Sequence, residues 1–223
     1  MGEVLEMMPM RMILAGLLLG SVAGCGSLDR GEAGWQHVSG MAKTIIKRKS
    51  EAATPLAEPT RAELAAFKQP ILEILSPNGR LFLVPVARRD GAEIWSTATR
   101  QTVLLRSGQI RATRGFGDAD IIEATGPDLA RLSAGGRYDR SFTKLDGADQ
   151  PIRTVMACQA KPVGAETVDI KGLAYNTRKI EETCESDGEV FETVFWLDAS
   201  GVRKSRQYLG DDIGYVTVSH VID

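Results

Sequence analysis

Two-residue turn signals recur along this 223-residue chain and constrain its fold more than any other feature. A two-residue β-hairpin turn needs positive φ at both central positions, which glycine adopts freely and aspartate tolerates. Five such signals at fairly regular intervals predict an antiparallel meander. We therefore expect a mainly β fold of coiled, twisted sheets, arranged as a sandwich or a partly open barrel. The signals are Asp90-Gly91, Ser107-Gly108, Asp146-Gly147, Asp187-Gly188 and Ser200-Gly201.

The segments beside these turns have the composition of strands. Leu81–Val86, Glu93–Thr97 and Thr102–Arg106 are rich in β-branched and aromatic residues. Both alternating faces of Val190–Leu197 are largely apolar, so we expect this strand to be buried on both sides. We expect the strongly polar segment after it, Val202–Gly210, to return alongside it as its pairing partner.

Short helices are predicted at the start of the β region and within it. Thr60 and Glu63 form a capping box, and the helix that they begin must end before Pro70. A second short helix is expected at Asp128–Ser133, ending at a Gly-Gly pair. Nearer the N-terminus, Trp35–Lys47 carries apolar residues close to helical spacing.

The N-terminal segment is typical of a secretion signal. The apolar run Met12–Ala23 is shorter than the roughly 20 residues of a membrane-spanning helix and fits the hydrophobic region of a signal peptide. It ends in Val22-Ala23-Gly24-Cys25, which resembles the lipobox of bacterial lipoproteins. The resemblance implies cleavage before Cys25 and acylation of that residue. An ordinary secretory signal, or a core helix that ends in Ala-Gly-Cys, is the alternative.

These features divide the chain into three parts. We expect a lipoprotein signal peptide at residues 1–24, a lipid-anchored tether with a short helix at 25–59, and a single β-rich domain at 60–223. Gly26 follows the lipobox cysteine, whereas lipoproteins kept in the inner membrane often carry aspartate there. By this resemblance the protein is anchored in the outer membrane, with its body in the periplasm.

The two remaining cysteines, Cys158 and Cys184, are 26 residues apart. In the oxidising cell envelope an even pair usually forms a disulfide bond, which we predict here. A metal site would need further ligands, and no histidine lies near either cysteine in the sequence. Two buried free thiols are the alternative.

Few residues suggest catalysis or cofactor chemistry. The chain has two histidines, His37 and His220, and neither belongs to a recognisable nucleophile motif. We predict no catalytic residues, no cofactor and no metal. The formal net charge of −2 also argues against a nucleic-acid partner.

A binding surface remains as a candidate functional site. Trp95, Trp196 and Tyr208 can offer flat apolar faces to sugar rings, and Arg114 and Arg206 can bind acidic groups through paired donors. The alternative is structural: the tryptophans belong to the core and the arginines to a solvated sheet face.

Three segments resemble the YjbF/GfcB lipoproteins, the group 4 capsule polysaccharide lipoproteins. They are Leu104–Gly117, Phe195–Asp198 and Gly201–Gly210, and the resemblance extends over Ile71–Val221 and the lipobox. It implies a mainly β fold with coiled antiparallel sheets and a place among proteins of exopolysaccharide or capsule secretion. It brings no catalytic residues.

We therefore expect a non-enzymatic, lipid-anchored outer-membrane protein that assists export or assembly of an extracellular polysaccharide. Its partners would be the membrane, polysaccharide or other secretion proteins. Two other hypotheses stay open. One is a lipid or lipoprotein carrier with a half-open β-barrel cavity. The other is an enzyme acting on glycans, which needs two carboxylates about 5–10 Å apart.

Overall fold

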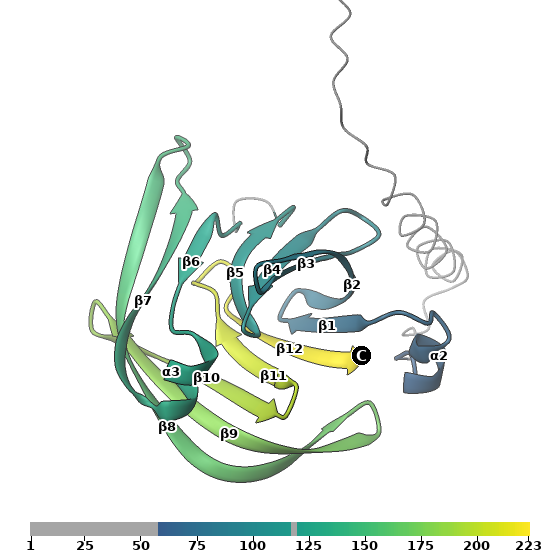
Figure 1. The fold of residues 1–223 in the computed structure, drawn as a ribbon. Helices are drawn as coiled ribbons and strands as arrows, with labels where there is room; N and C mark the ends of the chain where they lie inside the picture. Colours follow the sequence, from purple (N-terminus) through teal and green to yellow (C-terminus); the bar gives the residue numbers. More distant parts are fainter. Residues whose placement is uncertain (1–57, 117–119) are drawn as a thin grey trace, which may run out of the picture.

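The computed structural model describes residues 58–116 and 120–223, which form one strongly curved sheet and two short helices (Figure 1). Cys25, the expected signal peptide and the expected helix at Trp35–Lys47 lie outside the described residues. The elements are α2 (Arg61–Ala65), β1 (Ile71–Ser76), β2 (Gly79–Arg89), β3 (Ala92–Ser96), β4 (Thr102–Arg106), β5 (Gln109–Arg114), β6 (Glu123–Thr125), α3 (Leu129–Ala134), β7 (Gly136–Leu145), β8 (Pro151–Ile170), β9 (Leu173–Ser186), β10 (Glu189–Asp198), β11 (Gly201–Tyr208) and β12 (Tyr215–Ile222).

The strand order is β5-β4-β3-β2-β1-β12-β11-β10-β9-β8-β7-β6. Neighbours in the sheet are consecutive in the chain, except that β1 pairs with β12 and so joins the two ends of the domain. The sheet curls until β5 and β6 approach each other, and the Thr113 amide donates to the Ile121 carbonyl at 2.9 Å near this seam. The expected antiparallel meander is confirmed, in the form of a nearly closed barrel rather than a sandwich.

Three of the five predicted glycine turns have the expected geometry. The other two do not: between β7 and β8 the positive φ falls on Asp149, and at Ser200-Gly201 only the glycine has positive φ. Asp90-Gly91, Ser107-Gly108 and Asp187-Gly188 have positive φ at both residues and join β2 to β3, β4 to β5 and β9 to β10. Lys171-Gly172 forms a turn of the same kind between β8 and β9. The sequence does not predict this turn, because lysine rarely adopts positive φ.

Both predicted helix starts in the β region are confirmed. In α2 the Thr60 hydroxyl accepts from the Glu63 amide at 3.3 Å, and the Glu63 carboxylate accepts from the Thr60 amide at 2.8 Å. In α3 the Asp128 carboxylate accepts from the Arg131 amide at 2.7 Å. Among the described residues, no helix has the length and apolar character needed to cross a membrane.

The main hydrophobic core fills the concave side of the sheet. Its buried residues come from both halves of the meander: Leu72, Ile74, Leu83, Trp95, Val103, Leu105, Ile110, Ile121, Leu209, Val216 and Val218. Beside it, Leu132 of α3 packs on Ile180 and Phe195, so this helix lies within the curve of the sheet (Figure 1). The sheet therefore has one well-buried face over much of its area.

The strand β10 corrects one expectation. Thr193, Phe195 and Leu197 are buried as predicted, but Val190 is 60% exposed and Trp196 only half-buried. The sequence predicted burial on both faces, and this is wrong. The outward face of β10 has no full second layer over it, because α3 covers the concave side. The polar strand β11 does pair with β10, as predicted.

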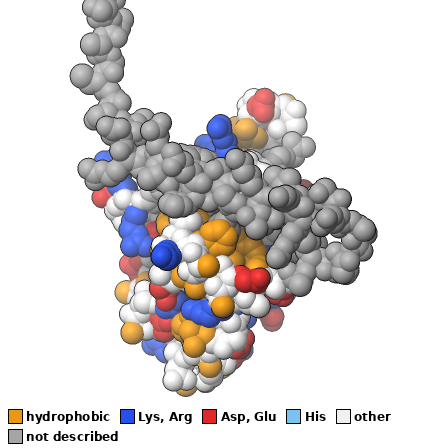
Figure 2. Space-filling view, turned by 90° about the vertical axis from the view of Figure 1, so that its right-hand side faces the viewer, with side chains coloured by type: hydrophobic (Ala, Val, Ile, Leu, Met, Phe, Trp, Pro, Cys, Tyr) orange, Lys and Arg blue, Asp and Glu red, His pale blue; other side chains and the backbone are white. Residues whose placement is uncertain are grey.

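The long β8–β9 hairpin reaches beyond β7, whose pairing with β8 ends at Ala160. Its far end packs against α2 and β12, where Ile170 joins the buried residues Leu64, Ile71 and Val221. Figure 2 shows this side of the molecule, on which charges of both signs alternate with hydrophobic side chains. Ion pairs link the elements here: Arg80–Glu58 at 2.8 Å, Arg80–Glu73 at 2.8 Å and Lys171–Glu73 at 3.1 Å.

Candidate functional site

Three of the five residues predicted for a binding surface lie on two adjacent strands. Trp196 of β10 pairs with Lys204 of β11, so their side chains project from the same face. Arg206 and Tyr208 follow at alternate positions of β11, so Arg206 shares that face. Tyr208 lies at the end of the strand, where its ring stacks on Phe191 with the centroids 4.0 Å apart, so one face of this ring is covered. Gln207, the residue between Arg206 and Tyr208, points to the concave side, where it contacts the β4–β5 turn. The shared face is thus the outer one.

Cations lie against aromatic rings along this face. The Lys204 ammonium lies 5.5 Å from the Trp196 ring centroid, and the Arg206 guanidinium lies 3.7 Å from that of Tyr215. The Tyr208 and Tyr215 centroids are 5.4 Å apart. All five side chains are half-buried. We call this set the aromatic strip: Trp196, Lys204, Arg206, Tyr208 and Tyr215.

Hydrogen bonds from the rims of the rings hold them in place. The Trp196 indole donates to Glu166 at 3.0 Å, and the Tyr215 hydroxyl accepts from the Glu192 amide at 3.1 Å. The Tyr208 hydroxyl donates to Asp211, and burial together with that carboxylate raises the pKa of Tyr208. The rings are therefore fixed before any ligand arrives.

The two cations of the strip keep unused donors. Within the described residues, neither Lys204 nor Arg206 makes a hydrogen bond or an ion pair; their contacts are with ring faces. A guanidinium stacked on a ring still presents its N–H groups at its edge, where carboxylate or phosphate oxygens can accept from them. The strip thus offers ring surface and positive charge together.

The other two predicted residues lie elsewhere. Trp95 is 2% exposed and belongs to the main core, where its indole donates to Glu93 at 3.1 Å and its ring meets His220 edge-on. Trp95 is therefore unavailable to a ligand at the surface. Arg114 is exposed at the end of β5, which is not a neighbour of β10 or β11 in the sheet.

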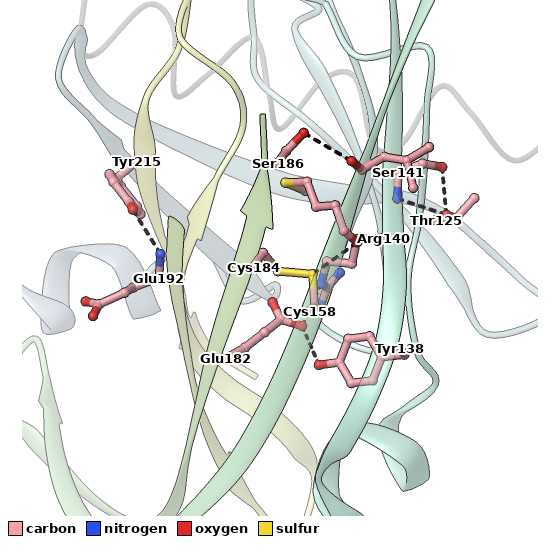
Figure 3. The surroundings of a disulfide bond; sticks show 12 residues. Thr125, Tyr138, Arg140, Ser141, Cys158, Glu182, Cys184, Ser186, Glu192 and Tyr215 are labelled. Carbon is pink, nitrogen blue, oxygen red and sulfur yellow. Dashed lines mark hydrogen bonds and ion pairs between the residues drawn. A yellow bond between two sulfur atoms is a disulfide. The ribbon is translucent and has the colours of Figure 1, made fainter. Parts of the chain in front are cut away.

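Cys158 and Cys184 form a disulfide bond, as the cysteine count predicted (Figure 3). They lie directly opposite each other on β8 and β9, and both are buried on the concave side. The Glu182 carboxylate lies close to the two sulfur atoms. Because the sulfurs are bonded to each other, this group of three does not offer thiolate ligands for a metal.

A charged network next to the disulfide was not predicted. The Glu182 side chain is fully buried, and its carboxylate accepts from Arg140 Nε at 2.7 Å and from the Tyr138 hydroxyl (Figure 3). Burial, and then this carboxylate, raises the pKa of Tyr138. The network lies on β7 and β9 and ties these strands together across β8.

A second arginine brings another positive charge to this region. Arg111 donates to the carbonyls of Gly126 and Pro127 at 3.2 and 3.1 Å. Burial, and then the charge of Arg140, lowers the pKa of Arg111 to about 10. A Cβ at Gly126 would lie 2.4 Å from Arg140 Nη1 and 2.9 Å from Arg111 Nη1, so any side chain at this position would displace the guanidinium groups.

Two buried glutamines tie the β4–β5 hairpin to other parts of the fold, and one of them, Gln207, joins two of the segments that carried the family resemblance. Gln207 of β11 accepts from the Ile110 amide at 3.0 Å and donates to the Gly108 carbonyl at 3.0 Å. Gln109 is fully buried and donates to the Pro127 carbonyl at 2.9 Å. A Cβ at Gly108 would lie 2.3 Å from Val202 Cβ, which shows how closely the β4–β5 turn meets β11. In the sequence, the one feature that could have predicted these contacts is the presence of polar residues at inward positions of a strand.

Two cavities lie on the concave side. The smaller, about 40 Å³, lies beside Arg140 and Cys184 and has room for water. The larger, about 220 Å³, lies between β1, β2, β4, β5 and β12. Neither is lined by a carboxylate, so neither presents the carboxylate pair that glycoside hydrolysis requires.

The chain is thus a nearly closed antiparallel barrel with a ring-and-cation strip on its outer face. A family model described as "Group 4 capsule polysaccharide lipoprotein gfcB, YjbF" matches residues 42–221. The chain therefore belongs to this family of lipoproteins, and the resemblance predicted from its motifs is confirmed.

Individual relatives agree with this assignment. The chain is 27% identical over 146 residues to the "Uncharacterized lipoprotein YjbF" of Escherichia coli (strain K12), covering 62% of this chain and 68% of the relative. The crystal structure of the hypothetical lipoprotein YmcC from Escherichia coli (K12) superposes with a TM-score of 0.64 at 18% identity. That match covers 83% of this chain and 95% of the solved chain, and it shows a shared fold.

Proposed function

We propose that this protein is an outer-membrane lipoprotein that assists export or assembly of an extracellular polysaccharide without catalysing a reaction on it. Membership of a capsule lipoprotein family supports the process. The aromatic strip supports the mode of action, because it is a pre-formed surface of rings and cations. In this proposal the lipid holds the domain at the membrane, and the strip contacts acidic sugars as the polymer passes.

The strip suits an extended acidic glycan in both chemistry and shape. Sugar rings pack their C–H faces on aromatic surfaces, and carboxylate or phosphate groups accept hydrogen bonds from guanidinium. From Lys204 to Tyr208 the strip follows β11 for about 13 Å, at roughly 3.3 Å per residue. A stretch of this length favours contact with more than one sugar residue.

Replacing Arg206 with alanine should weaken binding of an acidic polysaccharide by a factor of about 10 to 100, since hydrogen bonds to charged groups contribute roughly 1.5–3 kcal/mol. Binding of polygalacturonate to the purified full-length protein would be measured by calorimetry, with neutral dextran as the control ligand. Thermal unfolding should change little, because Arg206 makes no ion pair within the described chain.

Arg114→Ala is the matched control, since Arg114 is exposed on another part of the sheet. It should leave binding unchanged. Equal losses in the two variants would show that the strip is not the site. A large fall in the unfolding midpoint of Arg206→Ala would give Arg206 a structural role instead. Shortening of the polysaccharide by the wild-type protein would contradict the non-catalytic proposal.

The proposed anchor has its own test. Cys25→Ser should yield an unprocessed precursor that takes up no labelled palmitate, because the thiol that receives the lipid is gone. Buried acyl chains contribute about 0.8 kcal/mol per methylene, so the acylated protein should stay with the outer-membrane fraction while the variant does not. Normal palmitate labelling of the variant would exclude acylation at Cys25.

Transport of a whole lipid is the weaker candidate function. Pockets that enclose small-molecule ligands usually measure about 300–1,000 Å³. The larger cavity of this barrel, at about 220 Å³, is below that range. We therefore do not propose a carrier that encloses a complete lipid.

A further inference from the structure

Two arginine side chains converge beside Gly126, at the seam where β5 approaches β6. Arg111 belongs to β5 and Arg140 to β7, and Gly126 directly follows β6. A Cβ built on Gly126 would lie 2.4 Å from Arg140 Nη1 and 2.9 Å from Arg111 Nη1. The two nitrogens therefore flank a single point, and because glycine has no side chain, none from this position separates them.

A β-bulge sets the direction of the Arg111 side chain. Leu104 of β4 pairs with Ala112 and Leu105 pairs with Ile110, so Arg111 is the extra residue of the bulge and has no partner on β4. Bulges are common at sheet edges and next to functional sites, where they change the direction of a side chain. Since β5 is an edge strand of this sheet, the bulge lies at the β5–β6 seam.

Both guanidinium groups keep unused donors where they converge. Arg111 uses Nη2 for the carbonyls of Gly126 and Pro127, and Arg140 uses Nε for Glu182. Within the described residues, Nη1 of Arg111 and both Nη atoms of Arg140 make no hydrogen bond. Guanidinium N–H groups match the oxygens of carboxylates and phosphates in geometry and charge. The pair thus presents donors of the kind that bind such groups.

Positive charge exceeds negative charge around this point. Glu182 forms an ion pair with Arg140, whereas Arg111 has no ion-pair partner in the part of the chain that the structure describes. Arg106, exposed at the end of β4, is a third cation. Burial, and then the charges of Arg140 and Arg106, lower the pKa of Arg111 to about 10. An anion bound between the two guanidinium groups would offset this repulsion.

We propose that Arg111 and Arg140 together bind an oxoanion group, a carboxylate or a phosphate, beside Gly126. Its oxygens accept from Nη1 of both residues, and its charge balances the cation that Glu182 leaves uncompensated. Arg111 and Gly126 are half-buried rather than enclosed, so the group enters at the seam. The oxoanion is a free ion or a substituent of an acidic sugar, which the experiment distinguishes. The site lies on β5–β7 and the aromatic strip on β10–β12, so either proposal can fail without the other.

Two anionic probes and one neutral probe test the site. Inorganic phosphate is a free ion, galacturonate is a sugar with a carboxylate, and galactose is its neutral counterpart. The full-length protein would be kept in a neutral detergent at constant ionic strength, so that neither salt nor detergent changes the charge around the site. Binding would be measured by calorimetry and as the rise in the thermal midpoint, about 4 °C at a tenfold excess over Kd. Galactose should cause no rise. A response to phosphate alone identifies a free ion, and a response to galacturonate identifies a sugar acid.

Charge variants identify where the anion binds. Arg111→Gln should weaken binding of the anionic probe by a factor of about 10 to 100, the range for hydrogen bonds to charged groups. Arg114→Gln is the matched control, because Arg114 is exposed three residues further along the same strand, and it should leave binding unchanged. Glu182→Gln should strengthen binding, because it removes the neighbouring negative charge and keeps an oxygen acceptor for Arg140. A purely structural Arg111 would not produce that gain.

Gly126→Ala tests the geometry without changing any charge, and it serves as the second variant if Arg111→Gln folds poorly. A methyl group at this position displaces the two guanidinium groups, so it should weaken binding of the anionic probe. Gly147→Ala is the matched control, because a Cβ at Gly147 would meet no atom within 4 Å. It should bind the probe like the wild type.

Two results would overturn the proposal. One is equal stabilisation of the wild type, Arg111→Gln and Gly126→Ala, which would place the anion elsewhere or reveal the general effect of excluded salts such as phosphate. The other is the absence of any response of the wild type to either anionic probe. In that case Arg111 would serve only to hold the carbonyls of Gly126 and Pro127 against β5.

Discussion

Replacing Glu182 with leucine should lower the free energy of unfolding by about 3–5 kcal/mol, the cost of removing one partner from a buried ion pair. Glu182 is fully buried, and its carboxylate compensates Arg140, whose side chain is 12% exposed. Arg111 adds a second positive charge nearby. Without the carboxylate, Arg140 and the Tyr138 hydroxyl would lose their hydrogen-bond acceptor in a region with little water. Arg111 would lose a nearby negative charge. Urea unfolding of the purified protein measures the loss.

A neighbouring residue supplies the control for this prediction. Glu181 lies next to Glu182 on β9 but on the outer face, where it forms an exposed ion pair with Lys179 at 2.9 Å. Glu181→Leu should cost no more than about 1 kcal/mol, as exposed pairs do. The double variant Glu182→Leu with Arg140→Leu should recover much of the stability, because it removes the uncompensated charge as well. Equal effects of Glu181→Leu and Glu182→Leu would rule out a special contribution of the buried network.

The features that the sequence predicted well are those with local causes. The turn at Asp90-Gly91 needs only two residues that accept positive φ, and the capping box at Thr60 needs only a hydroxyl and a carboxylate three residues apart. A series of such turns leaves few topologies other than an antiparallel meander. The pairing of Cys158 with Cys184 followed from counting cysteines. None of these inferences needed the position of a distant strand.

The candidate site depended on the side of the sheet that each residue faces, which local sequence does not decide. Trp95 and Trp196 both lie in predicted strands, yet Trp95 is in the core and Trp196 is on the outer face. A shift of one residue in register moves a side chain to the opposite face. The register shift between Trp196 and Leu197 leaves Arg203 of β11 without a partner on β10, so the alternation changes at the border of the site. The grouping of Trp196, Arg206 and Tyr208 is therefore visible only in the folded sheet.

The buried network was missed for a related reason. Glu181 and Glu182 are identical neighbours in the sequence, and acidic residues in strands usually face solvent. Glu182 is buried because Arg140 and Tyr138 reach it from β7, on the far side of β8. That contact joins residues more than forty positions apart. Only the strand order β9-β8-β7 and its register bring these residues together.

Removing the Cys158–Cys184 disulfide should cost about 3–4 kcal/mol of stability, the value that the chain-entropy model gives for a loop of this length. Most of this cost belongs to the unfolded state, which gains freedom when the cross-link is absent. The double variant Cys158→Ala with Cys184→Ala should therefore keep its fold and unfold at lower urea concentration. In non-reduced wild-type protein, alkylation should find neither of these two thiols free.

Reducing the wild-type protein separates the effect of the cross-link from the effect of lost packing. Both cysteines are buried beside Met156 and the half-buried Phe191, so the alanine variant also leaves a small void. Reduced wild-type protein keeps the sulfur atoms and loses only the cross-link, so it should be more stable than the alanine variant and less stable than the oxidised protein. Reducing agent should not affect the alanine variant. If reduction left the wild-type midpoint unchanged, the cross-link would contribute nothing, and the β8–β9 pairing alone would hold this part of the barrel.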